Sequence, residues 1–216
     1  MGVREFEKLP YAEYLEDFTG HLAREGDYDT VHLRDREFDD LDAGNARFLE
    51  SAFTSVTFNG GRYRRSRFND VWMRSVRWVG ADLGETDWLH ADVDGGVLAG
   101  VRLDGAVLRR VVFQNCKFDS VNFRAAELRE VTFTDCVLRA ADFGEATLAG
   151  VRFDGCVLQE TRVGKAKMTD VDLRGVRELG IADGVAALDG ATISGAQLLQ
   201  LAPLMADLLG IVVTDE

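Results

Sequence analysis

The sequence lacks a long apolar run and holds few cysteines. No stretch approaches the roughly 18 consecutive apolar residues that a membrane-spanning helix needs, and the N-terminal residues lack the make-up of a signal peptide. Only 3 of the 216 residues are cysteine, whereas 46% are apolar, which is enough for a continuous core. These features predict a folded, cytoplasmic protein that does not enter a membrane.

Histidine is also scarce, and the three histidines, His21, His32 and His90, are scattered along the chain. No serine or cysteine motif surrounds them, and their spacing is not that of a metal site. The many aspartates form no pair that is typical of acid–base catalysis. We therefore expect no catalytic residues, no bound metal or cofactor, and no enzyme activity.

Basic residues are outnumbered, which gives a net charge of −12. The excess lies at the ends: residues 1–50 carry −8 and residues 176–216 carry −5, whereas residues 51–175 carry +1. This balance disfavours direct binding to a nucleic acid and favours solubility or a basic partner.

What the chain does contain is a repeat of five residues. From Leu33 to Leu173, every fifth residue is a centre position, and of these 29 positions only Ala43 is not large and apolar. The residue two before each centre is small or β-branched over the clearest stretch, Phe113 to Leu158. Neither a helix nor an ordinary strand has this period, so the pattern indicates a solenoid whose units bury their apolar side against one another.

The units resemble the A-(D/N)-(L/F)-x-x motif of the pentapeptide-repeat family, as in residues 141–145 (ADFGE) and 146–150 (ATLAG). The resemblance implies a right-handed quadrilateral β-helix with four units per coil and with centre and minus-two side chains inside. The expected organisation is an N-terminal capping segment (1–30), the β-helix (31–193) and a C-terminal helical dimerisation segment (194–216).

Two patterns bear on a coil of twenty residues. Cys116, Cys136 and Cys156 stand twenty apart, which predicts one interior column of buried free thiols. Charged residues twenty apart between Asp42 and Arg174 give thirteen opposite-sign and three like-sign pairs. A spacing of fifteen gives six against eleven, but twenty-five gives twelve against four, so charge alone does not select twenty.

Both ends depart from the repeat. Tyr11, Tyr14, Leu15, Phe18 and Leu22 fall on one helical face, which predicts a short amphipathic helix that caps the first coil or binds a partner.

At the other end, Ser194 is expected to cap a helix that runs to about Leu209 and stops at Gly210. This helix is apolar on more than one face, so we expect a homodimer. The predicted dimerisation residues are Leu198, Leu201, Leu204, Met205 and Leu208.

The C-terminal segment is similar to that of actinobacterial pentapeptide proteins related to the mycobacterial quinolone-resistance (Qnr-like) proteins. That resemblance implies dimerisation through this segment and an interaction with DNA gyrase by imitation of DNA. The candidate partner surface comprises an acidic coil and one tryptophan expected to point outward: Asp82, Glu85, Asp87, Asp92, Asp94 and Trp72.

Arginines of the preceding coil, Arg62, Arg65, Arg67 and Arg74, are expected to stack against four of these carboxylates and neutralise them. Two hypotheses therefore stand. The protein is a gyrase-interacting DNA mimic that modulates quinolone action, or it is a structural or adaptor module that binds another protein.

Overall fold

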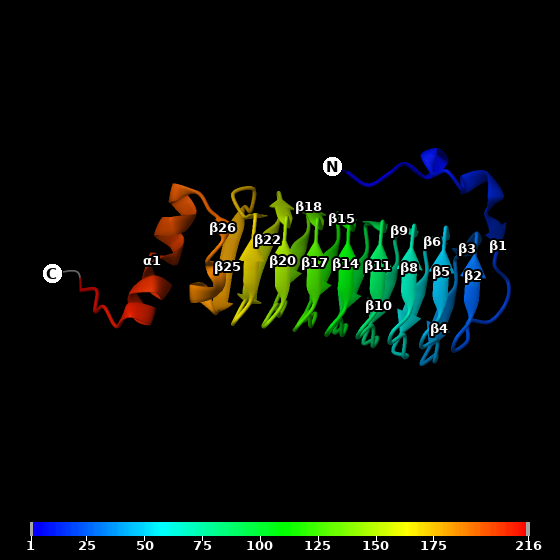
Figure 1. Cartoon of the computed structure of the whole chain (residues 1–216), viewed down its shortest axis with the longest axis horizontal. Helices are drawn as coiled ribbons and strands as arrows, with labels where there is room; N and C mark the ends of the chain where they lie inside the picture. Colours follow the sequence, from blue (N-terminus) through cyan, green and yellow to red (C-terminus); the bar gives the residue numbers. More distant parts are fainter. Residues whose placement is uncertain (1, 215–216) are drawn as a thin grey trace.

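The protein is a solenoid of parallel β-strands with one α-helix at its C-terminal end (Figure 1). The structure, a computed structural model, describes residues 2–214. The strands form three sheets, and each strand pairs with the strand one coil before and one coil after it. The predicted all-β quadrilateral β-helix is therefore confirmed.

The three sheets are named A, B and C. Sheet A contains β1 (Glu16–Asp17), β3 (Val31–Arg34), β6 (Ala52–Thr54), β9 (Trp72–Arg74), β12 (Asp92–Asp94), β15 (Val112–Gln114), β18 (Thr132–Thr134), β21 (Arg152–Asp154), β24 (Val171–Asp172) and β26 (Ala191–Thr192). Sheet B contains β2 (Asp27–Asp29), β5 (Arg47–Leu49), β8 (Arg67–Asn69), β11 (Asp87–Leu89), β14 (Val107–Arg109), β17 (Glu127–Arg129), β20 (Thr147–Ala149) and β23 (Lys167–Thr169). Sheet C contains β4 (Glu37–Asp39), β7 (Thr57–Asn59), β10 (Arg77–Val79), β13 (Val97–Ala99), β16 (Lys117–Asp119), β19 (Val137–Arg139), β22 (Val157–Arg162) and β25 (Glu178–Asp183).

The fourth face is a line of single parallel bridges rather than a sheet. It joins Asp42, Arg62, Asp82, Arg102, Asn122, Asp142 and Arg162 in turn. Every step along this face is twenty residues, as is the step between Phe113 and Phe133 in sheet A. The coil of twenty residues, which charge alone did not select, is thus established by the pairing.

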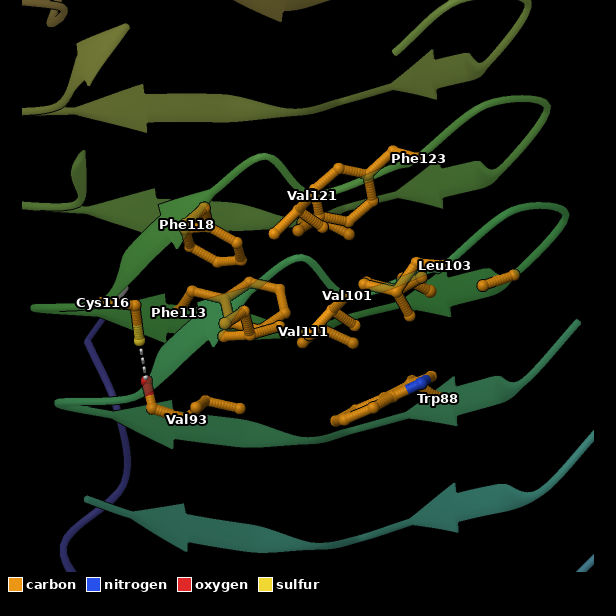
Figure 2. Packing of buried hydrophobic residues seen from close by; sticks show 14 of the residues in the cluster. Trp88, Val93, Val101, Leu103, Val111, Phe113, Cys116, Phe118, Val121 and Phe123 are labelled. Carbon is orange, nitrogen blue, oxygen red and sulfur yellow. Dashed lines mark hydrogen bonds between the residues drawn. The ribbon is translucent and has the colours of Figure 1, made fainter. Parts of the chain in front are cut away.

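The interior is filled by the centre and minus-two side chains, as the five-residue period predicts (Figure 2). Equivalent aromatic rings stack on one another, for example Phe123 on Phe143, with ring centroids 4.8 Å apart. Each buried Phe or Leu stabilises the fold by about 1.5 to 3 kcal/mol before entropy, against about 0 to 1 for an exposed ion pair. The apolar columns therefore hold the solenoid together.

The corners have left-handed backbone, two residues after each centre. Ala125 and Ala140 adopt φ of 54° and 51° there, so the corner is imposed by the coil and not by glycine. The corners of the repeat therefore accept polar residues and alanine as well as glycine.

The phase of the repeat falters after Leu173 because sheet C gains one residue. Leu158 pairs with Leu179, twenty-one residues on, and Leu179 and Ile181 fill the interior in place of Glu178 and Asp183. The spacing returns to twenty where Val171 pairs with Ala191. A 3-10 helix, η3 (Val185–Leu188), lies between these strands, and the last coil is completed by β26.

The C-terminal helix α1 (Gly195–Leu209) begins and ends where the sequence predicts. Ser194 and Gln197 form a capping box, and Gly210 ends the helix with a left-handed φ of 68°. The Gln197 amide also donates to the backbone carbonyls of Leu173 and Val176, which fixes α1 against the last coil.

The predicted N-terminal amphipathic helix is wrong. Two single-turn 3-10 helices, η1 (Phe6–Lys8) and η2 (Ala12–Tyr14), stand in its place, and Tyr14 is 65% exposed. The end of the solenoid is instead covered by Phe18 and Leu22, which pack on the core from extended chain. Figure 1 shows residues 2–15, named the strap below, running back along the side of the solenoid.

Candidate interaction surfaces

All five carboxylates of the predicted acidic surface lie within reach of an arginine. Glu85 is held by Arg65 and Arg64, which lower its pKa, and Asp94 lies 3.8 Å from Arg74. Glu85 and Asp94 are therefore each paired with an arginine of the preceding coil.

Asp87 and Asp92 have partners that the twenty-residue spacing did not indicate, whereas Asp82 has one such partner and one that lies twenty residues away. The Asp82 side chain contacts Arg64 at 3.2 Å and Arg102 at 3.8 Å, although its backbone bridges to Arg62. Asp87 accepts hydrogen bonds from Arg109 of the following coil at 2.9 and 3.0 Å and not from Arg67. Arginine is long enough to reach diagonally, so some side-chain pairs follow the backbone register, as Arg74 with Asp94 does, and others do not, as with Arg109 and Asp87.

Asp92 is not a surface carboxylate at all. It is 4% exposed, and its partner is Arg4 of the strap, 88 residues earlier. The same guanidinium donates to the backbone carbonyl of His90 at 2.9 Å and lies 3.9 Å from Asp70. This contact could not be predicted from the sequence, because the strap has no repeat that would indicate its position.

Trp72 is likewise not an exposed residue. It points outward from β9 as predicted but is 4% exposed, because the strap covers it. Its indole nitrogen donates to the backbone carbonyl of Arg4 at 2.9 Å, and the Phe6 ring lies 5.0 Å away. Leu9 and Tyr11 complete a second small apolar cluster with Trp72, separate from the core.

His32 is buried at the same place. Phe6 packs on its ring at 5.3 Å, its Nε2 lies 2.8 Å from the Thr54 hydroxyl, and its Nδ1 accepts from Arg34. Burial, with the Arg34 charge beside it, lowers the pKa of His32 to about 4. The imidazole is therefore neutral at neutral pH. It serves as a packing and hydrogen-bonding group.

No face of the solenoid is a continuous acidic stripe. When the five-residue units between residues 26 and 195 are assigned to their four faces, the net charge is −2 on the sheet A face, −3 on B, −1 on C and 0 on the bridge face. Opposite charges alternate along the bridge face, as in Asp42, Arg62 and Asp82. The body is thus a salt-bridged mosaic, and the remaining acidity lies at its ends.

The cysteines form the predicted interior column. All three are buried and free, and each thiol donates to a backbone carbonyl of the preceding coil, as Cys116 does to Val93 (Figure 2). Hydrogen bonding to Cys116 and burial raise the pKa of Cys136 to about 12. The Cys136 thiol is therefore not a nucleophile at neutral pH.

The five predicted dimerisation residues divide into two groups. Leu201 is 1% exposed and belongs to the core, and Leu204 and Met205 pack half-buried on the coil end. Leu198 and Leu208 are exposed, and the further exposed apolar residues beside them are Leu199, Leu209, Ile211, Val212 and Val213. Leu201 seals the solenoid, so it is not available to a second subunit.

Within residues 2–214, no group of three or more His, Cys, Asp or Glu side chains is arranged to hold a metal ion. In the same part of the chain, no helix combines the length and the hydropathy that a membrane crossing requires.

Residues 106–181 match the model of the family described as the pentapeptide repeat region. The same five-residue pattern of centres and the same strand pairing extend on both sides of this stretch.

Several solved structures are similar to this chain. One is HetL, a pentapeptide repeat protein involved in heterocyst differentiation regulation from the cyanobacterium Nostoc sp. strain PCC 7120, with 17% identity, a TM-score of 0.46, and coverage of 79% of this chain and 90% of HetL. Another is trypsin-treated QnrB1 carrying M102R, a plasmid-mediated fluoroquinolone resistance protein, with 16% identity, a TM-score of 0.46, and coverage of 92% and 96%. No curated protein sequence matches the chain. Likeness at this level does not transfer a function.

Proposed function

We propose that the protein is a non-catalytic adaptor that binds another protein through the outer surface of its solenoid. The observation that carries the proposal is the neutral mosaic: carboxylates on the body are paired with arginines, and no face carries more than three net charges. A surface of this kind provides hydrogen bonds and shape more than long-range attraction. Half-buried outward valines, such as Val97, Val107 and Val112, add apolar contact area.

The dependence of binding on salt concentration distinguishes this adaptor function from imitation of DNA. Binding to a neutral mosaic should survive a rise in ionic strength that shortens the Debye length from about 10 Å to 3 Å. The test is capture of lysate proteins on the immobilised chain at both salt concentrations, followed by titration of the purified partner. Loss of all specific binding at high salt would contradict the adaptor proposal.

The second candidate function is interaction with DNA gyrase as a DNA mimic, with an effect on quinolone action. The observation that favours it is the acidity of the N-terminal end, where residues 1–50 carry −8. Glu37, Asp39 and Asp40 are exposed there, and among residues 2–214 none of the three makes an ion pair. If the protein imitates DNA, this end and not the paired coil of Asp82 to Asp94 should make the contact.

A gyrase supercoiling assay tests the second candidate, with and without a quinolone. Inhibition that weakens with salt, and that falls on changing Glu37, Asp39 and Asp40 to amides, would support DNA imitation. The matched control changes Asp87 and Asp94 to Asn, which removes paired charges and should leave inhibition unaltered. A pull-down probed for gyrase subunits is the companion experiment. Absence of any effect on supercoiling at micromolar protein removes this candidate and leaves the adaptor.

We further propose that the protein is a homodimer through the outer side of α1. Leu198 and Leu208 are exposed beside Leu199 and Leu209, and an apolar helix face of this kind supports association. Changing Leu198 and Leu208 to Glu should give a monomer with an unchanged melting temperature. The control is Leu201→Glu, which places a charge in the core and should destabilise the last coil instead. Light scattering that shows a monomer for the unaltered chain would contradict the dimer.

A further inference from the structure

The outer face of sheet A is covered over its first coils and bare beyond them. Ala52, Trp72 and Asp92 occupy equivalent outward positions on successive strands and are all buried, because the strap lies on them. The next outward residues in the column, Val112 and Thr132, are only half-buried. Among the described residues, one sheet face therefore carries a polypeptide on its first half and none on its second.

The strap is held the way a bound peptide is held. Its chain makes two backbone contacts with side chains of the body: the Arg4 carbonyl accepts from Trp72, and the Val3 amide donates to Gln114 Oε1 at 3.3 Å. Between them, the Arg4 guanidinium reaches the buried carboxylate of Asp92. No strand pairing joins residues 2–15 to the solenoid in the described chain, since the first ladder contact is Glu16 with Val31.

The fit of the strap is incomplete. The Tyr11 hydroxyl is buried and, among the described residues, has no hydrogen-bond partner. A buried hydroxyl without a partner is unfavourable, so the strap is bound less tightly than its apolar contacts allow. The sheet beneath keeps its ladder whether or not the strap is present, because every hydrogen bond of that ladder lies within the solenoid.

The face continues into an open groove. A groove of about 720 Å³ begins at Gly2 and Arg4 and runs over Val112 and Thr132. Its other lining residues are His90, Gly150 and five charged residues whose signs alternate along the chain: Asp92, Arg110, Glu130, Arg152 and Asp170. A segment longer than the strap, lying in the same direction, would fill this groove.

We propose that the outer face of sheet A is a peptide-binding face and that the strap is its internal occupant. A partner protein displaces the strap with an extended segment that carries an arginine close to an aromatic residue. Asp92 binds the arginine, and Trp72 provides both an apolar platform and a donor to the peptide carbonyl. This rests on the adaptor function proposed above and names the partner's recognition element.

The direct test uses a labelled synthetic peptide of residues 2–15 added to the full-length protein. An intramolecular strap competes at an effective concentration of roughly millimolar, so the unaltered chain should bind the peptide weakly. A full-length variant with Arg4→Ala and Phe6→Ala has a weakened strap and an intact face, and should bind at least about tenfold more tightly. Trp72 emission gives a second signal, because Trp78 and Trp88 are enclosed in the core.

Matched variants distinguish binding through the arginine contact from non-specific binding. In the weakened-strap background, Asp92→Asn should reduce peptide affinity by about tenfold or more, as should Arg4→Glu in the peptide. Tyr11→Phe in the otherwise unaltered chain removes the unpartnered hydroxyl, tightens the strap and should lower peptide binding several-fold. Circular dichroism melts check that each variant keeps its solenoid.

Three results would overturn the proposal. They are equal peptide affinity for the unaltered and weakened-strap chains, equal binding of the Arg4→Glu peptide, and a dimer that persists with Leu198 and Leu208 changed to Glu but is lost with Arg4 and Phe6 changed to Ala. The last would assign the face to the strap of a second copy. None of these results alters the salt test of the adaptor function, so the two proposals fail separately.

Discussion

The interior columns and the strap are ordered by different means. In the interior, each side chain meets its own equivalent one coil away, as Phe133 meets Phe153 at 4.9 Å, and a continuous ladder supports the contact. The strap has no equivalent elsewhere in the chain, and its contacts, such as Arg4 with Asp92, join residues far apart in sequence. Periodic order is cooperative along the whole solenoid, whereas residues 2–15 take no part in the strand ladder.

The largest effect should come from breaking a column. Phe123→Ala leaves a cavity between the stacked rings of the interior and should cost about 3 to 5 kcal/mol of unfolding free energy. Gly150→Ala is the control, because a Cβ at this corner would meet nothing nearer than 3.9 Å and its left-handed φ is shared by Glu130 of the same column. Its cost should be about 1 kcal/mol. Equal losses in urea melts would show that the interior does not dominate.

A fall in pH should weaken the packing of the strap around His32 before it weakens the interior columns. The folded pKa of His32, about 4, lies below its ordinary value of 6.5, so the unfolded chain takes up the proton first as pH falls. Stability that His32 contributes above pH 6.5 is therefore lost progressively between pH 6.5 and 4, by about 2 to 3 kcal/mol in all.

His32→Gln keeps a donor and an acceptor for Thr54 and Arg34 but does not titrate. The difference between the two pH profiles, followed by tryptophan emission and by urea melts, isolates the histidine. Superimposable profiles from pH 7 to 4 would contradict the prediction.

A smaller, stabilising effect is expected at the one-residue shift in sheet C. Thr161 is 1% exposed, its hydroxyl has no hydrogen-bond partner among the described residues, and it lines a void of about 20 Å³. Thr161→Val has nearly the same shape and removes the unpartnered hydroxyl, so stability should rise by about 1 kcal/mol. Thr132→Val, on the outer face, is the control and should change little. A loss of stability at Thr161 would mean that its hydroxyl is satisfied.

The smallest effect should come from the surface mosaic. Asp87→Asn and Asp94→Asn each remove one partly exposed ion pair, with Arg109 and Arg74 respectively. Each should change the unfolding free energy by about 0 to 1 kcal/mol, and by less at high salt. A loss above that of Gly150→Ala would show that the mosaic contributes to the strength of the solenoid as well as to its register.

The interior could be predicted from the sequence because a period specifies which way each side chain points. The centres at Phe113 and Phe118 and the thiol column follow from counting alone, and the cap at Ser194 follows from residue type. What lies on the outside could not be predicted, since outward is not the same as exposed. Trp72 and Asp92 point outward, but their burial depends on Arg4 and Phe6, for which no spacing rule exists.

The N-terminal helix was predicted for the related reason that five apolar residues satisfied a helical face. In the structure these residues serve several contacts at once: Tyr11 packs on sheet A, Phe18 and Leu22 cover the coil end, and Tyr14 is exposed. A period read over so short a stretch does not separate one helix face from several unrelated contacts.

Because each coil of the regular repeat has twenty residues, the length of the solenoid depends directly on the number of coils. Ala106 and Ala126 occupy the same place one coil apart, so joining Ala106 directly to Glu127 would remove one complete coil, including the Gln114 acceptor of the strap, and keep the register of the remaining coils. Neighbouring strands of a sheet lie about 4.8 Å apart. The distance between the strap end and α1 therefore changes by about 4.8 Å for each coil that is added or removed. Two partners bound at these ends would be separated by a distance that the number of coils determines.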